Sequence, residues 1–168
     1  MRIVGVNDIY TLENMPRLKS LIEHYSKTDP ADVFIVTLAG DFVSPSILSS
    51  LDAGHGMIEC MNMAGITHVC LGNHEDDISS EELLKRVDEF HGTWIDTNVR
   101  IRADLPKSVV FRVSSNETRT VNVGTIGVVT VDPALYRPPF TSQQSAPASE
   151  AAMAETARLV WEEGLAVC

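Results

Sequence analysis

The sequence predicts an α/β sandwich, and three observations support this fold class. Short apolar runs of strand length alternate with segments of helical period through residues 2–90. Beyond Gly92 the helical period disappears and shorter runs typical of β-strands follow. No internal repeat of fixed period is visible. The chain has 168 residues, 44% of them hydrophobic, so it can bury one substantial core. We therefore expect a single domain over residues 1–168.

The first part of the chain predicts two β-α steps. Residues 2–6 form a short buried strand, and residues 14–27 then change to a helical period. The apolar face of this helix consists of Leu18, Leu21, Ile22 and Tyr25. Residues 33–38 are a continuous apolar run, as expected of a buried strand. The following pair, Ser44-Pro45, has the order of a capping residue and a first-turn proline, which predicts a helix start there.

Two further steps follow. Residues 56–64 have helical spacing, Gly65 can close that helix, and residues 67–71 are the next short strand. Ser79 and Glu82 then have the spacing of a capping box at the start of another helix. Its apolar face consists of Leu83, Leu84, Val87 and Phe90.

The second half predicts strands and one more helix. The predicted strands are residues 93–97, 109–113 and 120–131, with a hairpin turn at 114–117. After a Pro/Ser/Gln-rich stretch, a helix is expected at 150–163. Residues 164–168 resemble the opening of another strand, so we expect the sheet to be truncated at its C-terminal end.

Charge and composition limit the classes of partner. The formal net charge is −10, from 23 acidic and 13 basic residues, which disfavours binding to nucleic acid or an anionic membrane. No leader, apolar signal sequence or membrane-spanning run is visible, which predicts a cytoplasmic protein provided that no upstream leader has been removed. Cys60, Cys70 and Cys168 lack metal-type spacing, and we expect buried reduced thiols.

Three of the apolar strands end in a polar residue: Asp8, Asp41 and Asn73. Sites in α/β sheets form beyond the carboxyl ends of the strands, so neighbouring strands would bring these side chains together. Carboxylate and amide oxygens suit hard or borderline cations such as Mg²⁺, Mn²⁺, Zn²⁺ or Fe. An aspartate between two such ions can bridge them. The sequence therefore predicts a cation site at this sheet edge.

Three blocks carry a more specific resemblance. Asp8 in Asn-Asp-Ile-Tyr, Gly40-Asp41, and Gly72-Asn73-His74-Glu75 with Asp77 resemble the first three signature blocks of the calcineurin-like metallophosphoesterases. The Gly-Asn-His-Glu-x-Asp form resembles the 5′-nucleotidase branch in particular. The resemblance implies an α/β sandwich of two mixed sheets faced by helices, of which this chain is the N-terminal part.

The resemblance also implies roles for individual residues. Asp8 would bind the first of two divalent metal ions, Asp41 would bridge both, and Asn73 would bind the second. His74 would stabilise the transition state or act as a general acid, and Asp77 would fix its tautomer and orientation. A hydroxide activated by the metals would attack phosphorus in line.

Two departures from the family pattern concern the metal ligands. Tyr10 stands where the family has a histidine ligand, and a neutral phenol with a pKa near 10 is a poor ligand for Mg²⁺ or Mn²⁺. Tyr10 is therefore a doubtful metal ligand. The later ligands of the family, a Thr-His at the end of the strand after the third block and a downstream Gly-His-x-His, have no counterpart in the chain. We expect a fragment or a truncated product with an incomplete metal site.

The expected function is metal-dependent, 5′-nucleotidase-like hydrolysis of a small phosphate ester, with nucleotides as the substrate that the resemblance implies. The alternative is a catalytically impaired fragment that acts as a binding or structural module. The acidic charge disfavours a nuclease, and the Glu-x-Asp extension disfavours a protein phosphatase. A truncated sheet would expose a strand edge, so the missing C-terminal half or a second copy is an expected partner.

The other histidines and the tryptophans are expected to have structural roles. His24 falls on the polar side of its helix and His91 follows a helix, so both should face solvent. His68 lies within a strand and His55 in a glycine-flanked loop, and neither is expected to be catalytic. Trp94 and Trp161 are expected as anchors of the core or of an interface.

Overall fold

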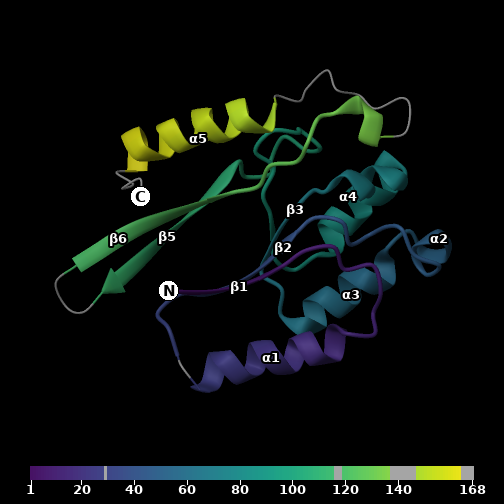
Figure 1. The fold of residues 1–168 in the computed structure, drawn as a ribbon, viewed down its shortest axis with the longest axis horizontal. Helices are drawn as coiled ribbons and strands as arrows, with labels where there is room; N and C mark the ends of the chain where they lie inside the picture. The colour runs from purple at the N-terminus through teal and green to yellow at the C-terminus, as the bar shows by residue number, and fades with distance from the viewer. Residues whose placement is uncertain (29, 116–118, 137–146, 164–168) are drawn as a thin grey trace.

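The computed structural model describes the whole chain except residues 29, 116–118, 137–146 and 164–168. Four strands form a parallel sheet in the order β1-β2-β3-β4: Arg2–Val6, Phe34–Ala39, His68–Cys70 and Thr93–Trp94. β5 (Ser108–Ser115) and β6 (Arg119–Ile126) form a separate antiparallel pair. The α/β fold class is thereby confirmed, with the parallel pairs in one sheet and the antiparallel pair in the other (Figure 1).

Helices connect the parallel strands and cover one face of their sheet. These helices are α1 (Met15–Thr28), α2 (Ser49–Asp52), α3 (His55–Ala64) and α4 (Ser80–Glu89), whereas α5 (Ala148–Glu163) follows the antiparallel pair. Short 3-10 turns occur at η1 (Asn73–Asp77) and η3 (Pro133–Leu135). α3 packs between α1 and α4 on the same side of the sheet (Figure 1). None of the helices that the structure describes is long and apolar enough to cross a bilayer.

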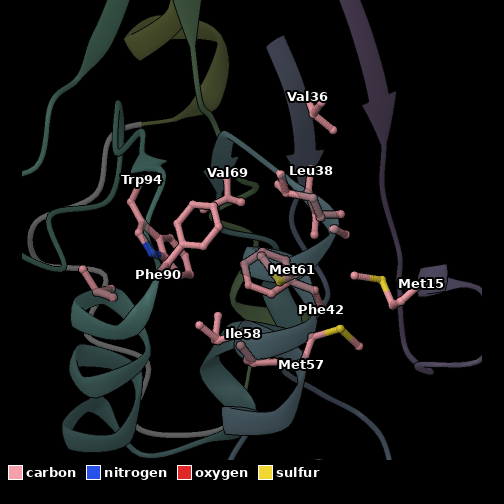
Figure 2. Close-up of a cluster of buried hydrophobic side chains, with 14 of the residues drawn as sticks. Met15, Val36, Leu38, Phe42, Met57, Ile58, Met61, Val69, Phe90 and Trp94 are labelled. Carbon is pink, nitrogen blue, oxygen red and sulfur yellow. The ribbon is translucent and has the colours of Figure 1, made fainter. Parts of the chain in front are cut away.

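The main core lies between the parallel sheet and these helices. Val36 and Leu38 of β2 point into it and are 0% and 1% exposed. They pack in one cluster with side chains from α3, with Phe90 and with Trp94 (Figure 2). Val36 and Leu38 face the same core because every second side chain of a strand points to the same side of the sheet. This core fixes the positions of the strand ends, where the polar residues lie.

The antiparallel pair covers the opposite face of the sheet near β3. The rings of His68 and Phe111 are in edge contact, with centroids 5.1 Å apart. At Gly127 an added Cβ would lie 2.5 Å from the Cβ of Cys70, so this position requires a glycine. α5 packs against β6, on the far side from the helices of the parallel sheet (Figure 1). The result is the layered arrangement that the sequence predicts.

Several predicted boundaries are confirmed. Gly65 ends α3 with a left-handed conformation (φ 90°), as the sequence predicts. The Ser79 side chain accepts a hydrogen bond from the backbone N–H of Glu82, so the predicted cap of α4 is present. The predicted final helix at 150–163 corresponds to α5. The predicted turn at 114–117 and strand at 164–168 fall in part or entirely outside the described residues.

Other details differ from the prediction. The helix expected at Ser44-Pro45 begins only at Ser49, after a turn in which Ser46 and Ser49 exchange side-chain and backbone hydrogen bonds (2.9 Å each). The strand predicted at 93–97 ends at Trp94. Beyond it, Thr97 turns its hydroxyl to the carbonyl of Lys107 (2.5 Å). Leu84, predicted on the apolar face of α4, is 37% exposed.

Candidate functional site

The ends of β1, β2 and β3 meet at one edge of the parallel sheet. The Asp8 N–H, just after β1, donates to the Gly40 carbonyl, just after β2, at 3.3 Å. Asp41 Oδ1 in turn accepts the backbone N–H of His74, in the turn after β3, at 2.9 Å. Direct hydrogen bonds therefore join the three loops that carry the sequence motifs.

Asp8 and Asp41 both adopt a left-handed backbone conformation, with φ values of 54° and 58°. Residues other than glycine rarely adopt this conformation, and such positions cluster at functional sites. At both positions the chain turns sharply as it leaves a strand.

Two glycines permit the close approach of the second and third loops. A Cβ on Gly72 would overlap Asp41 Oδ1, and a Cβ on Gly40 would overlap the backbone nitrogen of Gly72. Gly40 also has a positive φ of 79°. The glycines that precede Asp41 and Asn73 are therefore required by the space between the loops.

Glu75 is the buried clamp of the site. Its side chain is 1% exposed, and its carboxylate accepts four backbone N–H groups. Oε1 accepts from Phe42 (2.8 Å) and Val43 (3.2 Å), and Oε2 accepts from Asp41 (2.9 Å) and Gly72 (2.5 Å). Burial raises the pKa of this carboxyl, and the four N–H donors oppose that shift. The sequence did not predict that Glu75 accepts these backbone N–H groups, because Glu75 was considered only as part of the Gly72–Glu75 motif.

His74 and Asp77 form a hydrogen-bonded pair beside this clamp. The Nδ1 atom of His74 lies 2.9 Å from Asp77 Oδ2, and the Ser44 hydroxyl donates to the same oxygen at 3.2 Å. A carboxylate only accepts hydrogen bonds, so Nδ1 carries the proton in this pair. The other ring nitrogen, Nε2, then points away from Asp77. Ser44 is a second residue that sequence reasoning assigned elsewhere, as a helix cap.

Tyr10 contacts both ends of the site. Its hydroxyl donates to Asp8 Oδ1 at 3.1 Å, and its ring meets the His74 ring edge-on at 5.9 Å. The other Asp8 oxygen accepts from the Asn7 side chain. Burial, and next the hydrogen bond to Asp8, raise the pKa of Tyr10 to about 12.

The donors at this edge fit part of the coordination shell of a divalent cation. Asp8 and Asp41 would supply carboxylate oxygens, and Asn73, half-buried at the start of η1, would supply an amide oxygen. No group of three or more His, Cys, Asp or Glu side chains gathers in a metal-binding arrangement among the residues that the structure describes. The donor types are therefore suitable, and their number in the described part is low.

An open pocket of about 440 Å³ runs along the end of β1 to α1. Asn7, Asp8 and Tyr10 line one end of it, and Met15 and Leu18 of α1 line the other. Its volume is within the range of small-molecule sites. A ligand could therefore reach Asp8 from this side.

The remaining histidines lie outside this site. His24 and His91 are exposed, as predicted. His68 is half-buried beside the Thr67 hydroxyl (2.8 Å), and burial lowers its pKa. His55 pairs with Glu89 of α4 at 3.0 Å.

The two tryptophans differ in burial, and the two described cysteines are free thiols. Trp94 is buried in the core, as expected, whereas Trp161 is 90% exposed and is no core anchor. Cys60 and Cys70 are free thiols that are half-buried. Burial raises the pKa of Cys70 to about 11, so this thiol is inert.

A family model covers most of the chain. Residues 1–130 match the family model described as calcineurin-like phosphoesterase. The chain therefore belongs to the calcineurin-like phosphoesterase family, as the three sequence blocks predict.

Solved structures with the same fold include nucleotidases. The NAD nucleotidase NadN of Haemophilus influenzae is similar with a TM-score of 0.74 and 18% identity, over 97% of this chain and 32% of that chain. A 5′-nucleotidase precursor from Thermus thermophilus has a TM-score of 0.76 and 18% identity, over 97% and 35%. A putative 5′-nucleotidase from Staphylococcus aureus has a TM-score of 0.71 and 18% identity, over 94% and 34%.

These similarities concern the fold, because the identities are low. The chain spans about a third of the length of each of these proteins. No curated protein sequence matches the chain.

Proposed function

We propose that the edge formed by Asp8, Asp41 and Asn73, with His74 beside it, hydrolyses a small phosphate ester with the help of divalent metal ions. The observation that carries this proposal is the hydrogen bond from the His74 N–H to Asp41 Oδ1 (2.9 Å). This bond holds the acid–base residue and the central metal-ligand candidate in one rigid unit. Membership of a phosphoesterase family supports the same reaction.

The metal ions would be held by Asp8, Asp41 and Asn73, with Asp41 between the two ions. When bound, such ions supply positive charge that neutralises phosphoryl oxygens and the acidity that activates water. Tyr10 is a donor to Asp8 and is assigned no place among the ligands, since its hydroxyl already bonds that carboxylate.

His74 acts on the substrate through Nε2. Asp77 accepts the hydrogen on Nδ1 (2.9 Å) and so fixes the orientation of the ring. In its doubly protonated form, His74 can donate from Nε2 to a phosphoryl oxygen or to the oxygen of the leaving group. Asp77 is thus a positioning residue for His74, and the Ser44 hydroxyl donates a hydrogen bond to Asp77.

The proposed substrate is a nucleotide or a similar small monoester. The names of the structural neighbours, NAD nucleotidase and 5′-nucleotidase, support this class. The net charge of −10 makes a polyanionic nucleic acid a poor ligand. Nucleotide breakdown is the corresponding role.

A non-catalytic binding or structural module is the second candidate function. No three His, Cys, Asp or Glu side chains gather in a metal-binding arrangement among the described residues, which favours this candidate. Tyr10, which stands at the place of an expected histidine ligand, favours it as well.

The hydrolysis of 4-nitrophenyl phosphate with added Mn²⁺ separates these two functions. We expect the wild-type chain to release 4-nitrophenol faster than the Asp41→Ala and His74→Ala variants. Removal of a group that stabilises the transition state costs about 10²-fold or more in rate. Wild-type activity equal to that of both variants would refute hydrolysis and favour the module.

A further inference from the structure

A second pocket, of about 380 Å³, lies between the loops that follow β1 and β2. Residues 10–13 form one wall and residues 43–49 form another, and α3 contributes a side chain to the lining. The apolar side chains that line this pocket include Leu12, Val43, Ile47, Leu48 and Met57, together with the ring of Tyr10. A volume of this size, with mostly apolar walls and a few polar groups, is typical of a small-molecule site.

This pocket adjoins the candidate site at Tyr10, which contacts both Asp8 and His74. Tyr10 lines both this pocket and the pocket that contains Asp8. The wall at residues 43–49 is attached to the site, because Val43 N–H donates to Glu75 (3.2 Å) and the Ser44 hydroxyl donates to Asp77 (3.2 Å). A ligand with its phosphate near Asp8 and His74 would therefore have its substituent beside Tyr10, at the entrance of the apolar pocket.

The charges in the lining determine which substituent fits. Glu13 and Asp52 line the pocket, and no Lys, Arg or His lines it within the described part of the chain. Asp52 is engaged by the backbone N–H groups of Gly54 (3.0 Å) and Gly56 (2.8 Å). A further phosphate group on the ligand would meet carboxylates with no basic partner, which is unfavourable. An uncharged group would instead gain by burial against the apolar walls.

We propose that this pocket binds the uncharged, apolar or flat group of a phosphomonoester, the part of the substrate that leaves as an alcohol. The identity of this occupant rests on the proposed function. In that hydrolysis the bond between phosphorus and the ester oxygen breaks, water supplies its oxygen to phosphorus, and a proton goes to the alcohol. The pocket would thus favour monoesters of aromatic or heterocyclic alcohols over di- and triphosphate esters.

Ile47 and Leu51 offer a matched test of this pocket. Ile47 lines it and is 87% exposed, whereas Leu51, on the adjoining helix α2, is 83% exposed and does not line it. Replacement of either by serine removes a similar exposed apolar side chain, so neither change should disturb folding. Thermal unfolding of both variants checks this point.

The probe is benzyl alcohol, titrated into the full chain while backbone amide resonances are followed by NMR. We expect shifts at residues 10–13 and 43–49, and Ile47→Ser should weaken binding by about threefold because it removes part of the apolar wall. Leu51→Ser should leave the affinity unchanged. Equal weakening by both substitutions, or shifts confined to other surfaces, would overturn the proposal.

A second readout links the pocket to the reaction. With Mn²⁺, phenyl phosphate should be hydrolysed with a higher kcat/KM than methyl phosphate, and Ile47→Ser should reduce this preference while Leu51→Ser does not. An equal preference in both variants contradicts the leaving-group assignment. Absence of any Mn²⁺-dependent hydrolysis, together with intact binding of benzyl alcohol at Ile47, would instead contradict the proposed function and leave the apolar binding pocket in place.

Discussion

At the residue scale, the site depends on close packing between the loops that carry Asp41 and Gly72. Asp41 is the point of contact between the second and third loops, since it accepts from His74 and its own N–H donates to Glu75. Gly72 lies against the Asp41 carboxylate with no space for a side chain. The position of the carboxylate is therefore set by packing as well as by hydrogen bonds.

Gly72→Ala tests this close packing. The added methyl group would overlap Asp41 Oδ1, so we expect a loss of about 1–3 kcal/mol in the free energy of unfolding, measured by urea denaturation. Gly5→Ala is the control, because a Cβ there meets only the Thr37 hydroxyl at an ordinary 3.5 Å. Equal stability of the two variants would show that the loops are not tightly packed.

The residues that sequence reasoning could and could not place differ in where their partners lie. The pairing of His74 with Asp77 is local, and short-range spacing with the family resemblance was enough to anticipate it. Glu75 and Ser44 have partners 33 residues away, at Phe42 and Asp77 respectively. Contacts over such distances depend on the order of the strands, which one sequence does not display.

At the element scale, the helices with a clear apolar period were predicted well, because burial of one face decides their position. α1 and α3 begin and end within one residue of expectation, and α4 begins directly after its predicted cap, Ser79. The start of α2 was predicted too early. Ser44-Pro45 has the pattern of a helix start, but the chain turns there, with hydrogen bonds between Ser46 and Ser49, and the helix begins at Ser49. The short β4 was overestimated for a similar reason, since Thr97 leaves the sheet to bond Lys107.

The attachment of α5 to the antiparallel pair provides a pH-dependent test. Glu155 is buried and accepts from Ser108 (2.5 Å) and Arg158 (2.7 Å), and Arg158 followed by Ser108 lowers its pKa below the usual 4.5. A carboxyl with a lowered pKa stabilises the fold fully above its unfolded value, and this contribution is lost as the pH falls through the folded value.

We therefore expect Glu155→Gln to destabilise the protein at pH 7. The difference from wild type in the free energy of unfolding should shrink as the pH falls below about 4.5. Glu150→Gln, at an exposed position of the same helix, is the control and should change little. A Glu155→Gln effect that is constant from pH 7 to pH 3 would contradict the assigned ion pair.

At the scale of the whole molecule, β1 forms an edge of the parallel sheet. It pairs with β2 alone within the described residues, and its Ile3 is 55% exposed. An apolar edge strand without lysine or proline is a template for pairing with another strand. We expect the chain to self-associate in a concentration-dependent manner, as seen by light scattering.

Ile3→Lys places a charge on this edge and should shift the protein toward the monomer. Leu51→Lys is the control, because Leu51 is also exposed but lies in α2. This substitution should not shift the protein toward the monomer. A wild-type protein that stays monomeric at all concentrations would contradict the role of the β1 edge.

We propose that Asp8, Asp41 and Asn73 form one cation site at the edge of the parallel sheet. Binding of Mn²⁺, measured from the loss of its free-ion EPR signal, tests it without any assumption about catalysis. We expect wild-type protein to bind Mn²⁺ and Asp41→Ala to bind it at least about tenfold more weakly, while the exposed Asp104→Asn behaves as wild type. Equal Mn²⁺ binding by wild type and Asp41→Ala would contradict the account.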